Sequence, residues 1–475
     1  MATRHRPEIA LSSHDHAPDP NAPPDTVLAF ARHAAATTYA DLPPNAITAA
    51  KWSIMDTISC MLAGSRGPSA LALLEVAKSW GGTPESTVTG HDIKLPSYLA
   101  TMVNCGMVHQ HDFDDTHDTA VCHPTSASLN AALSTAESLG GVDGRTLLTA
   151  IAIGVDIQCR LAGALRGMLW DYHWVRAPMV GIFGAAVSAG KIYKLEGMHN
   201  AMGLSLPQVA GTLESVTGVR SAVRTMRDGL IYKDAILAAK LASRGVRGED
   251  RVFDGPYGLY AAYFRSDYNR EFLTHELGRR FEGAGVSLKP WPFCRHTHGT
   301  LTALLEVLEE NAGAEVRDVL LYVGKGNAII CRKPWPTTSI DALCNLVFAC
   351  SVAMVHRAVP LEAVEAGALD APAVVAAAKK IRFEVEAAME KYGTIEPGHV
   401  VVSFADGRKV ERYVDRALGH PTNPMSILRI RAKMENCMGY VGLPDVKNRA
   451  QQLIDTVMVL EDMQDVRALG DLMRH

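Results

Sequence analysis

Apolar residues recur at three- and four-residue spacing along most of the chain, a pattern typical of helices that bury one face. In the first half this pattern predicts helices over residues 26–37, 45–63, 69–80, 99–108, 125–139, 144–164, 179–190, 200–209 and 235–243. Pro43-Pro44 and Gly140-Gly141 mark turns between them. Since few stretches alternate with a period of two, we expect a large, mainly helical domain.

The pattern changes near residues 255–269, where Pro256, Gly258 and several tyrosines interrupt the helices. Beyond this point the sequence predicts helices over 299–310 and 341–353, a strand over 316–323, and a hairpin of 399–405 with 409–415 around Asp406-Gly407. Helical periodicity returns over 425–437 and 445–460. We therefore expect a mobile N-terminal arm (1–23), a helical domain (24–268) completed by 416–475, and a smaller α+β domain at 269–415.

Composition excludes several classes of protein. Hydrophobic residues make up 48% of the chain and charged residues 21%, as in ordinary globular proteins. The net charge is −4 and no basic stripe is present, so we expect no nucleic-acid partner. The longest charge-free apolar runs, 177–190 and 343–355, are shorter than the roughly 20 residues that span a bilayer, so we expect no membrane association. The nine cysteines are scattered without CxxC pairs, which favours reduced thiols in a cytoplasm.

Residues 104–123 are the most concentrated source of proton-transferring groups in the chain. The stretch contains His109, His111, Asp112, Asp114, Asp115, His117, Asp118 and His123, followed by Pro124. Carboxylates held close raise one another's pKa and cations lower it, which is how a base near neutral pH is made. Predicted helices on both sides would draw the loop into the interior, so we expect a site for proton abstraction. The alternative is a solvated turn in which Asp112 or Asp115 caps the next helix.

Two metal sites compete with this interpretation. Asp114, Asp115 and Asp118 have the D-D-x-x-D spacing that holds magnesium and a diphosphate in helical isoprenoid synthases. A zinc site of His109, His111 and His123 is the other possibility. The chain has no second metal motif and no H-E-x-x-H, and aromatic residues are only 6%. We therefore expect no metal and no cofactor.

The same stretch resembles a known family. Asn104, Gly106 and His109, then Asp112–His117 (DFDDTH) and His123-Pro124 are similar to the signature of the MmgE/PrpD family. This family includes 2-methylcitrate dehydratases, cis-aconitate decarboxylases and iminodisuccinate epimerases. The resemblance implies a mainly α fold in which an inserted α+β lid covers a cleft of the helical domain, and it implies a homodimer.

The resemblance also implies roles for individual residues. Asp112 or His123 would take the proton, and Thr116 would donate a hydrogen bond to a substrate oxygen. His117 would protonate a departing hydroxyl, or His173 would, since the family has a histidine near this position before a glycine-rich helix.

Substrate carboxylates would be held by cations. Many family members carry a lysine where this chain offers Arg224 or Arg227, and either guanidinium can clamp a carboxylate with two hydrogen bonds. Lys289 matches a family lysine, and its place between Leu288 and Pro290 suggests burial against an anion. The remaining substrate-binding candidates are His109, Cys294 and His296.

Two departures from the family bear on the reaction. Cys294 stands where some decarboxylases have histidine, and Phe348 stands where the family helix often has tyrosine. Phe348 disfavours decarboxylation, because it lacks the tyrosine hydroxyl. We expect a metal-free lyase of small di- or tricarboxylates, most simply a 2-methylcitrate dehydratase-like hydro-lyase, with a decarboxylase or epimerase as the alternative. The alternatives from other classes are a magnesium-dependent isoprenoid synthase and a non-catalytic carboxylate binder.

Overall fold

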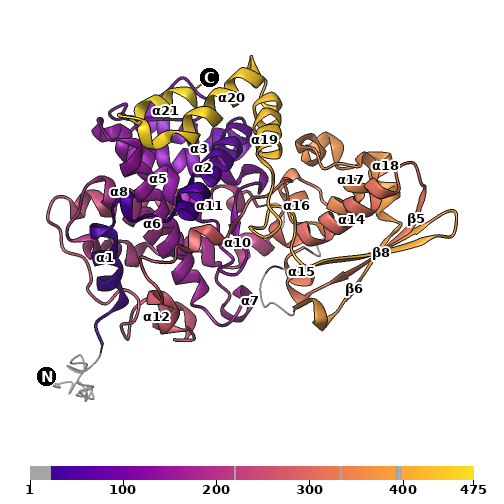
Figure 1. Ribbon diagram of the computed structural model, residues 1–475, viewed down its shortest axis with the longest axis horizontal. Coiled ribbons are helices and arrows are strands. Elements are labelled where there is room, and N and C mark those ends of the chain that lie inside the picture. Colours follow the sequence, from indigo (N-terminus) through magenta and orange to yellow (C-terminus); the bar gives the residue numbers. More distant parts are fainter. Residues whose placement is uncertain (1–22, 219–220, 332–333, 391–394, 396, 475) are drawn as a thin grey trace, which may run out of the picture.

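The computed structural model describes residues 23–474 except 219–220, 332–333, 391–394 and 396. Its described residues form a large helical domain and a smaller lobe of helices around a sheet (Figure 1). The mobile arm predicted for residues 1–23 lies outside the described residues, apart from Pro23.

The helical domain is built from both ends of the chain. Its helices are α1 (Thr26–Ala36), α2 (Pro44–Gly64), α3 (Pro68–Trp80), α4 (Ser97–Val108), α5 (Pro124–Leu139), α6 (Gly144–Gly163), α7 (Leu169–Tyr172), α8 (Arg176–Ile192), α9 (Met198–Ser205), α10 (Glu214–Thr217), α11 (Val223–Ala242), α12 (Leu259–Phe264), α13 (Arg270–Thr274), α19 (Ile427–Tyr440), α20 (Val446–Met458) and α21 (Arg467–Leu472). The last three, yellow in Figure 1, pack on the N-terminal helices and share their hydrophobic core.

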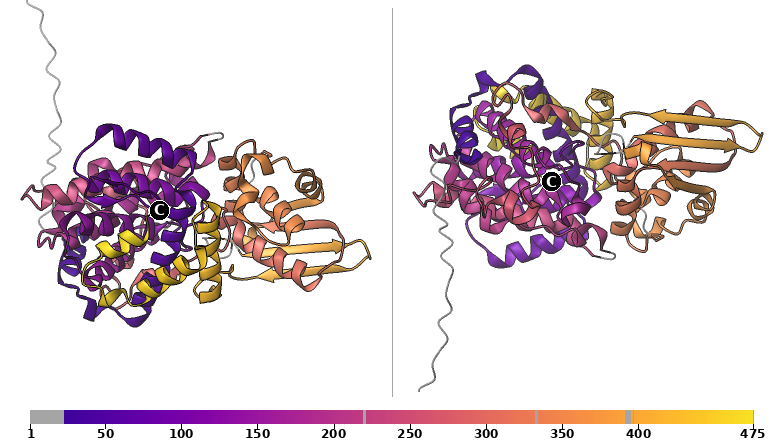
Figure 2. Two further views of the ribbon diagram at one scale, coloured as in Figure 1. Left: turned by 90° about the horizontal axis from the view of Figure 1, so that it is seen from above. Right: turned by 90° about the horizontal axis from the view of Figure 1, so that it is seen from below.

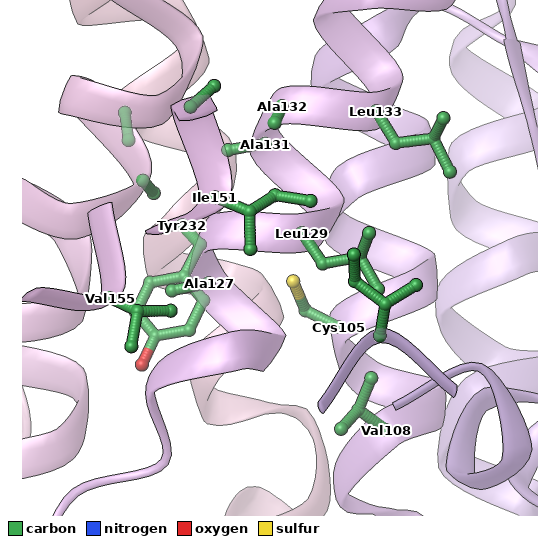
Figure 3. Packing of buried hydrophobic residues seen from close by; sticks show 14 of the residues in the cluster. Cys105, Val108, Ala127, Leu129, Ala131, Ala132, Leu133, Ile151, Val155 and Tyr232 are labelled. Atoms are coloured by element: carbon green, nitrogen blue, oxygen red, sulfur yellow. The ribbon is translucent and has the colours of Figure 1, made fainter. Parts of the chain in front are cut away.

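Small residues bring the central helices close together. A Cβ added at Gly154 of α6 would lie 2.7 Å from the carbonyl oxygen of Gly184 in α8, so only glycine permits this approach. Figure 3 shows the packing nearby, with alanines of α5 beside Ile151 of α6 and Tyr232 of α11. Among the described helices, α6 alone is long and apolar enough to cross a membrane, and 89% of its apolar window is buried inside the fold. This burial is typical of a core helix.

The smaller lobe, which we call the lid, has its own core between Phe293 and Phe404. It contains α14 (His298–Glu310), β5 (Val316–Val323), α15 (Lys325–Ile330), α16 (Ser339–Leu343), α17 (Leu346–His356), α18 (Pro372–Ala378), β6 (Ile381–Val385), β7 (Gly398–Phe404) and β8 (Lys409–Val414). The sheet order is β6-β5-β7-β8, parallel between β5 and β6 and antiparallel elsewhere. Figure 2 shows the lid as a separate lobe beside the helical domain.

Two short ladders complete the described strands. β1 (Ser86–Thr87) pairs with β2 (Lys94–Leu95), and β3 (Thr116–His117) pairs with β4 (Val286–Ser287), both antiparallel. The second ladder matters for the site, because it ties the acidic loop to the segment that enters the lid.

The predicted fold class, a mainly α protein with a smaller α+β domain, is confirmed. Two elements differ from the prediction. The helix expected over 341–353 is two helices, because Asn345 caps α17 by accepting from the Phe348 amide. The helix expected over 235–243 begins at Val223 instead. In addition, Leu273 and Val286 pack in the helical core, so the lid core begins later than the boundary predicted at residue 269.

Candidate active site

Asp112 lies between two cations at the junction of the domains. Its Oδ1 is 2.6 Å from Lys289 Nζ, and its Oδ2 is 3.0 Å from Arg224 Nη2. Burial alone would raise the pKa of Asp112, but Arg224 and Lys289 outweigh it and hold the pKa well below its usual value. Asp112 is therefore an ionised carboxylate that bridges two cations and offsets one of their two charges.

The backbone explains how Asp112 reaches this place. The one-turn helix η2 (His109–His111) ends at Asp112, whose φ of 47° is in the left-handed region. Aspartate adopts this conformation more readily than most residues. Lys289 follows β4, and its ammonium also donates to the Asp112 carbonyl oxygen at 2.8 Å. The cation that precedes the lid is thus fixed to both the backbone and the side chain of the acidic loop.

Asp114 lies between two imidazoles. Its Oδ1 is 3.2 Å from His109 Nδ1, and its Oδ2 is 3.1 Å from His123 Nδ1. Burial would raise the pKa of Asp114, but His109 and His123 lower it well below its usual value. Asp114 is therefore ionised, and it can orient both rings.

The hydrogen bonds of His123 fix its tautomer. Nδ1 lies 2.8 Å from the carbonyl oxygen of Asp115, which can only accept, so Nδ1 carries the proton. Thr116 Oγ1 is a further 3.4 Å neighbour of this nitrogen. Burial lowers the pKa of His123, and Asp114 offsets this only in part. Nε2 is consequently an unprotonated base at neutral pH, and no hydrogen bond among the described residues occupies it.

His109 is a charged imidazole that contacts the same carboxylate as His123, that of Asp114. Its Nε2 is 2.9 Å from Asp228 Oδ2, so the ring bridges Asp114 and Asp228. Burial would lower its pKa, but these two carboxylates raise the pKa of His109 to about 9. Asp228 is also 2.7 Å from Arg227 Nε. A continuous chain of ion pairs therefore runs from Arg227 of α11 to Asp114, which contacts His123.

Asp115 differs from its neighbour Asp114. Its side chain is fully buried, and burial raises its pKa to about 8, a shift that Thr125 opposes. Asp115 is therefore protonated and neutral at pH 7. Adjacent aspartates in one loop thus have opposite charge states.

Two guanidinium groups have unused donors. Nε and Nη1 of Arg224 and Nη2 of Arg227 are buried without a hydrogen-bond partner in the part of the chain that the structure describes. The Arg224 side chain is 11% exposed. Buried donors of this kind are costly unless an anion fills the space beside them. They are suited to a substrate carboxylate.

Comparison with known proteins identifies the family. The MmgE/PrpD N-terminal domain matches residues 28–271, and the MmgE/PrpD C-terminal domain matches residues 291–460. The chain belongs to the MmgE/PrpD family.

Several relatives in this family are similar over nearly their whole length. A cis-aconitate decarboxylase-like protein, oryM, from Aspergillus oryzae is 25% identical over 455 residues, covering 90% of this chain and 93% of the relative. The cis-aconitate decarboxylase of Aspergillus terreus is 23% identical, covering 91% and 92%. The human cis-aconitate decarboxylase is 24% identical, covering 90% of each chain.

The MmgE/PrpD motif residues are not all in one place. Six of the predicted site residues form one cluster around Asp112 and Asp114. Cys294 belongs to it as well, since its sulfur lies within 4.8 Å of an Asp112 oxygen. The six are His109, Asp112, Thr116, His123, Arg224 and Lys289. Arg227 joins them through Asp228.

The structure separates His117 and His173 from these contacts. His117 accepts from the Ala120 amide and lies 3.9 Å from Glu282. His296 is buried on η5 (Arg295–Thr297). His173 is exposed at the end of α7, beside a surface depression lined by Trp174 and Glu214.

The D-D-x-x-D alternative is contradicted. Asp114, Asp115 and Asp118 do not share a helix face, because the segment contains η2 and β3. Asp118 makes two 2.9 Å hydrogen bonds with Arg295 instead of facing a common ion. The zinc alternative fails in its third ligand, since His111 faces the Ala63 carbonyl and packs against Tyr440.

Sequence reasoning missed three supporting residues. Lys433 of α19 is 2.6 Å from Asp56 and donates to the carbonyl oxygens of Phe113 and Lys289. Asp228 holds His109. No local pattern marks them, although the adjacent charges of Arg227 and Asp228 were a signal that α11 carries an ion-pair network.

Proposed function

We propose that this protein is a lyase of small di- or tricarboxylates that removes a proton next to a carboxylate, with His123 as the base. The observation that carries the proposal is the fixed Nδ1–H tautomer of His123, which leaves Nε2 free beside a carboxylate clamp. The family membership and the names of the relatives support a lyase.

Each step uses a described group. The unused donors of Arg224 bind a substrate carboxylate, while Lys289 keeps the local charge positive. His123 Nε2 takes the proton, and Asp114 stabilises the imidazolium that forms. The negative charge spreads onto the carboxylate held by Arg224, where a cation stabilises it most. Asp112 keeps both cations in place, so the geometry favours His123 over Asp112 as the base.

The second part of the proposal concerns which group leaves the substrate after the proton is removed. Dehydration needs an acid for the departing hydroxyl, and the imidazolium that His123 forms by taking the proton can donate it to that oxygen. Decarboxylation is the second candidate, which the names of the relatives favour. Against it, Phe348 is buried in the lid core against Phe293 and Trp335, so this position supplies no hydroxyl. Epimerisation shares the same first step.

Proton NMR of a panel of di- and tricarboxylic acids in D2O tests the proposal. We expect deuterium incorporation next to a carboxylate, together with the signal of the alkene, the decarboxylated acid or the epimer. His123→Gln should lower the exchange rate by about 10²–10⁴-fold, the usual contribution of a general base. The matched control is His111→Gln on the same loop, which should retain exchange. Equal rates in the two variants would remove His123 from its role, and tight binding without exchange would indicate a binding protein.

We also propose a homodimer in the cytoplasm. Val223, Leu230, Leu237 and Leu241 form an exposed apolar stripe along α11, between 38% and 50% exposed. A second copy that covers this stripe would steady the helix that carries Arg224. All nine cysteines are free thiols, in keeping with a reducing compartment.

A further inference from the structure

A cluster of soft ligands lies on the lid side of Asp112. The sulfurs of Cys294 and Cys344 and a carboxylate oxygen of Asp112 all lie within 4.8 Å of one another, and all three residues are buried. Cys344 Sγ is 3.8 Å from Asp112 Oδ2. The proposed proton abstraction has no use for either thiol.

The lid backbone holds the two cysteines in position. Cys344 directly follows the last residue of α16, in the short non-helical segment before α17. The Cys294 amide donates to the carbonyl oxygen of Leu343 at 2.8 Å, so the two thiols are fixed by adjacent segments. Asp112 comes from the helical domain. The three donors therefore join the two domains.

We propose that Cys294, Cys344 and Asp112 form a binding site for a soft divalent cation such as Zn²⁺ or Cd²⁺. Two sulfurs and one oxygen match the ligands that zinc takes, with bonds of about 2.3 Å to sulfur and about 2.0–2.2 Å to oxygen. Water or a fourth protein atom would fill the fourth position. The ion would be an inhibitor and has no role in the proposed reaction.

The charge balance permits binding beside two cations. With neutral thiols, Asp112, Lys289 and Arg224 together carry one net positive charge. An ion that binds adds two positive charges while the two thiols lose two protons, so the net charge of the cluster does not change.

Occupation of the site has a predictable consequence, which rests on the proposed function. The ion would take the Asp112 oxygen that now faces Arg224, and it would link the lid to the helical domain. A substrate carboxylate could then neither reach Arg224 nor enter past a lid held shut. Inhibition should therefore weaken as substrate concentration rises.

A cadmium titration of the reduced full-length protein tests the binding itself. We expect one equivalent of Cd²⁺ to give ultraviolet thiolate-to-cadmium absorbance, with about two protons released per ion in weakly buffered solution. Cys344→Ala should weaken binding by at least about 10–100-fold, the range seen when metal sites lose a supporting group. Cys350→Ala, which removes another buried thiol of the lid, is the matched control and should bind like the parent protein.

Equal affinity in the Cys344 and Cys350 variants, or no absorbance with the parent protein, would overturn the proposal. If the Cys344 variant does not fold, zinc-edge X-ray absorption on the parent protein replaces it, and a first shell without two sulfurs overturns the proposal. Metal binding without any turnover of acids would refute the proposed function alone. Turnover that is insensitive to both ions, in a protein that does not bind them, would refute only the metal site.

Discussion

The contrast between Asp114 and Asp115 gives the sharpest test of the catalytic arrangement. Both are fully buried and adjacent, yet Asp114 is ionised against two imidazoles and burial raises the pKa of Asp115 to about 8. Replacing each by asparagine removes a charge in the first case and replaces a neutral acid by a neutral amide in the second. The two variants therefore separate charge from shape.

The structure sets the size of the expected effect. Asp114 Oδ2 is 3.1 Å from His123 Nδ1, and an opposite charge this close shifts a pKa by about 1–3 units. Asp114→Asn should lower the pKa of His123 by about one to two units and reduce kcat/KM by about 10–100-fold. The acidic limb of the pH profile should move to lower pH, because the imidazolium loses its counter-ion.

The assay is kcat/KM against pH for the acid that the NMR panel identifies, with thermal melting to confirm that each variant folds. Asp115→Asn should stay within about threefold of the parent rate below pH 7, where Asp115 is already neutral. A parent-like rate for Asp114→Asn would refute the pairing of Asp114 with the base. An equal loss in both variants would show that the loop tolerates no substitution, whatever the charge.

Three further predictions concern stability, binding and packing. Asp115 has a pKa of about 8 in the fold against 3.8 normally, so its burial costs stability as the pH rises between these values. Asp115→Asn should therefore raise the free energy of unfolding by up to about 5 kcal/mol at pH 8 and leave it unchanged near pH 4, as measured by urea titration. Arg224→Lys should raise KM by about tenfold with a smaller change in kcat, because a lysine lacks the planar fork; an unchanged KM would contradict this. Lys433→Met leaves Asp56 buried without its cation and should lower the free energy of unfolding by about 3–5 kcal/mol. Adding Asp56→Asn should recover part of this loss. A parent-like urea midpoint for Lys433→Met would contradict a stabilising role for the pair.

Local patterns in the sequence carried the fold class and the location of the site. The period of apolar residues marks most helices, and the His/Asp loop is the buried cluster it was expected to be. The burial of Lys289 against an anion also followed from its apolar neighbours. These features depend on residues that are close in sequence.

The remaining parts of the site depend on contacts between distant segments. Asp228 and Lys433 meet the acidic loop only after the helices pack, so their roles have no local signature. The start of α11 was missed because its first turns are polar, and its close approach to α4 at Gly229 is a tertiary feature. His173 shows the converse, since an exposed histidine and a catalytic one look alike in a local pattern.

The position of Lys433 in the chain has a consequence for biosynthesis. This residue leaves the ribosome after every catalytic candidate, yet its ammonium fixes the carbonyl oxygens of Phe113 and Lys289. The nascent N-terminal helices can pack early, as domains generally do during translation. The catalytic loop, however, is completed only when α19 arrives. A polypeptide truncated before α19 would therefore lack the cation that holds the catalytic loop, and we expect it to be inactive.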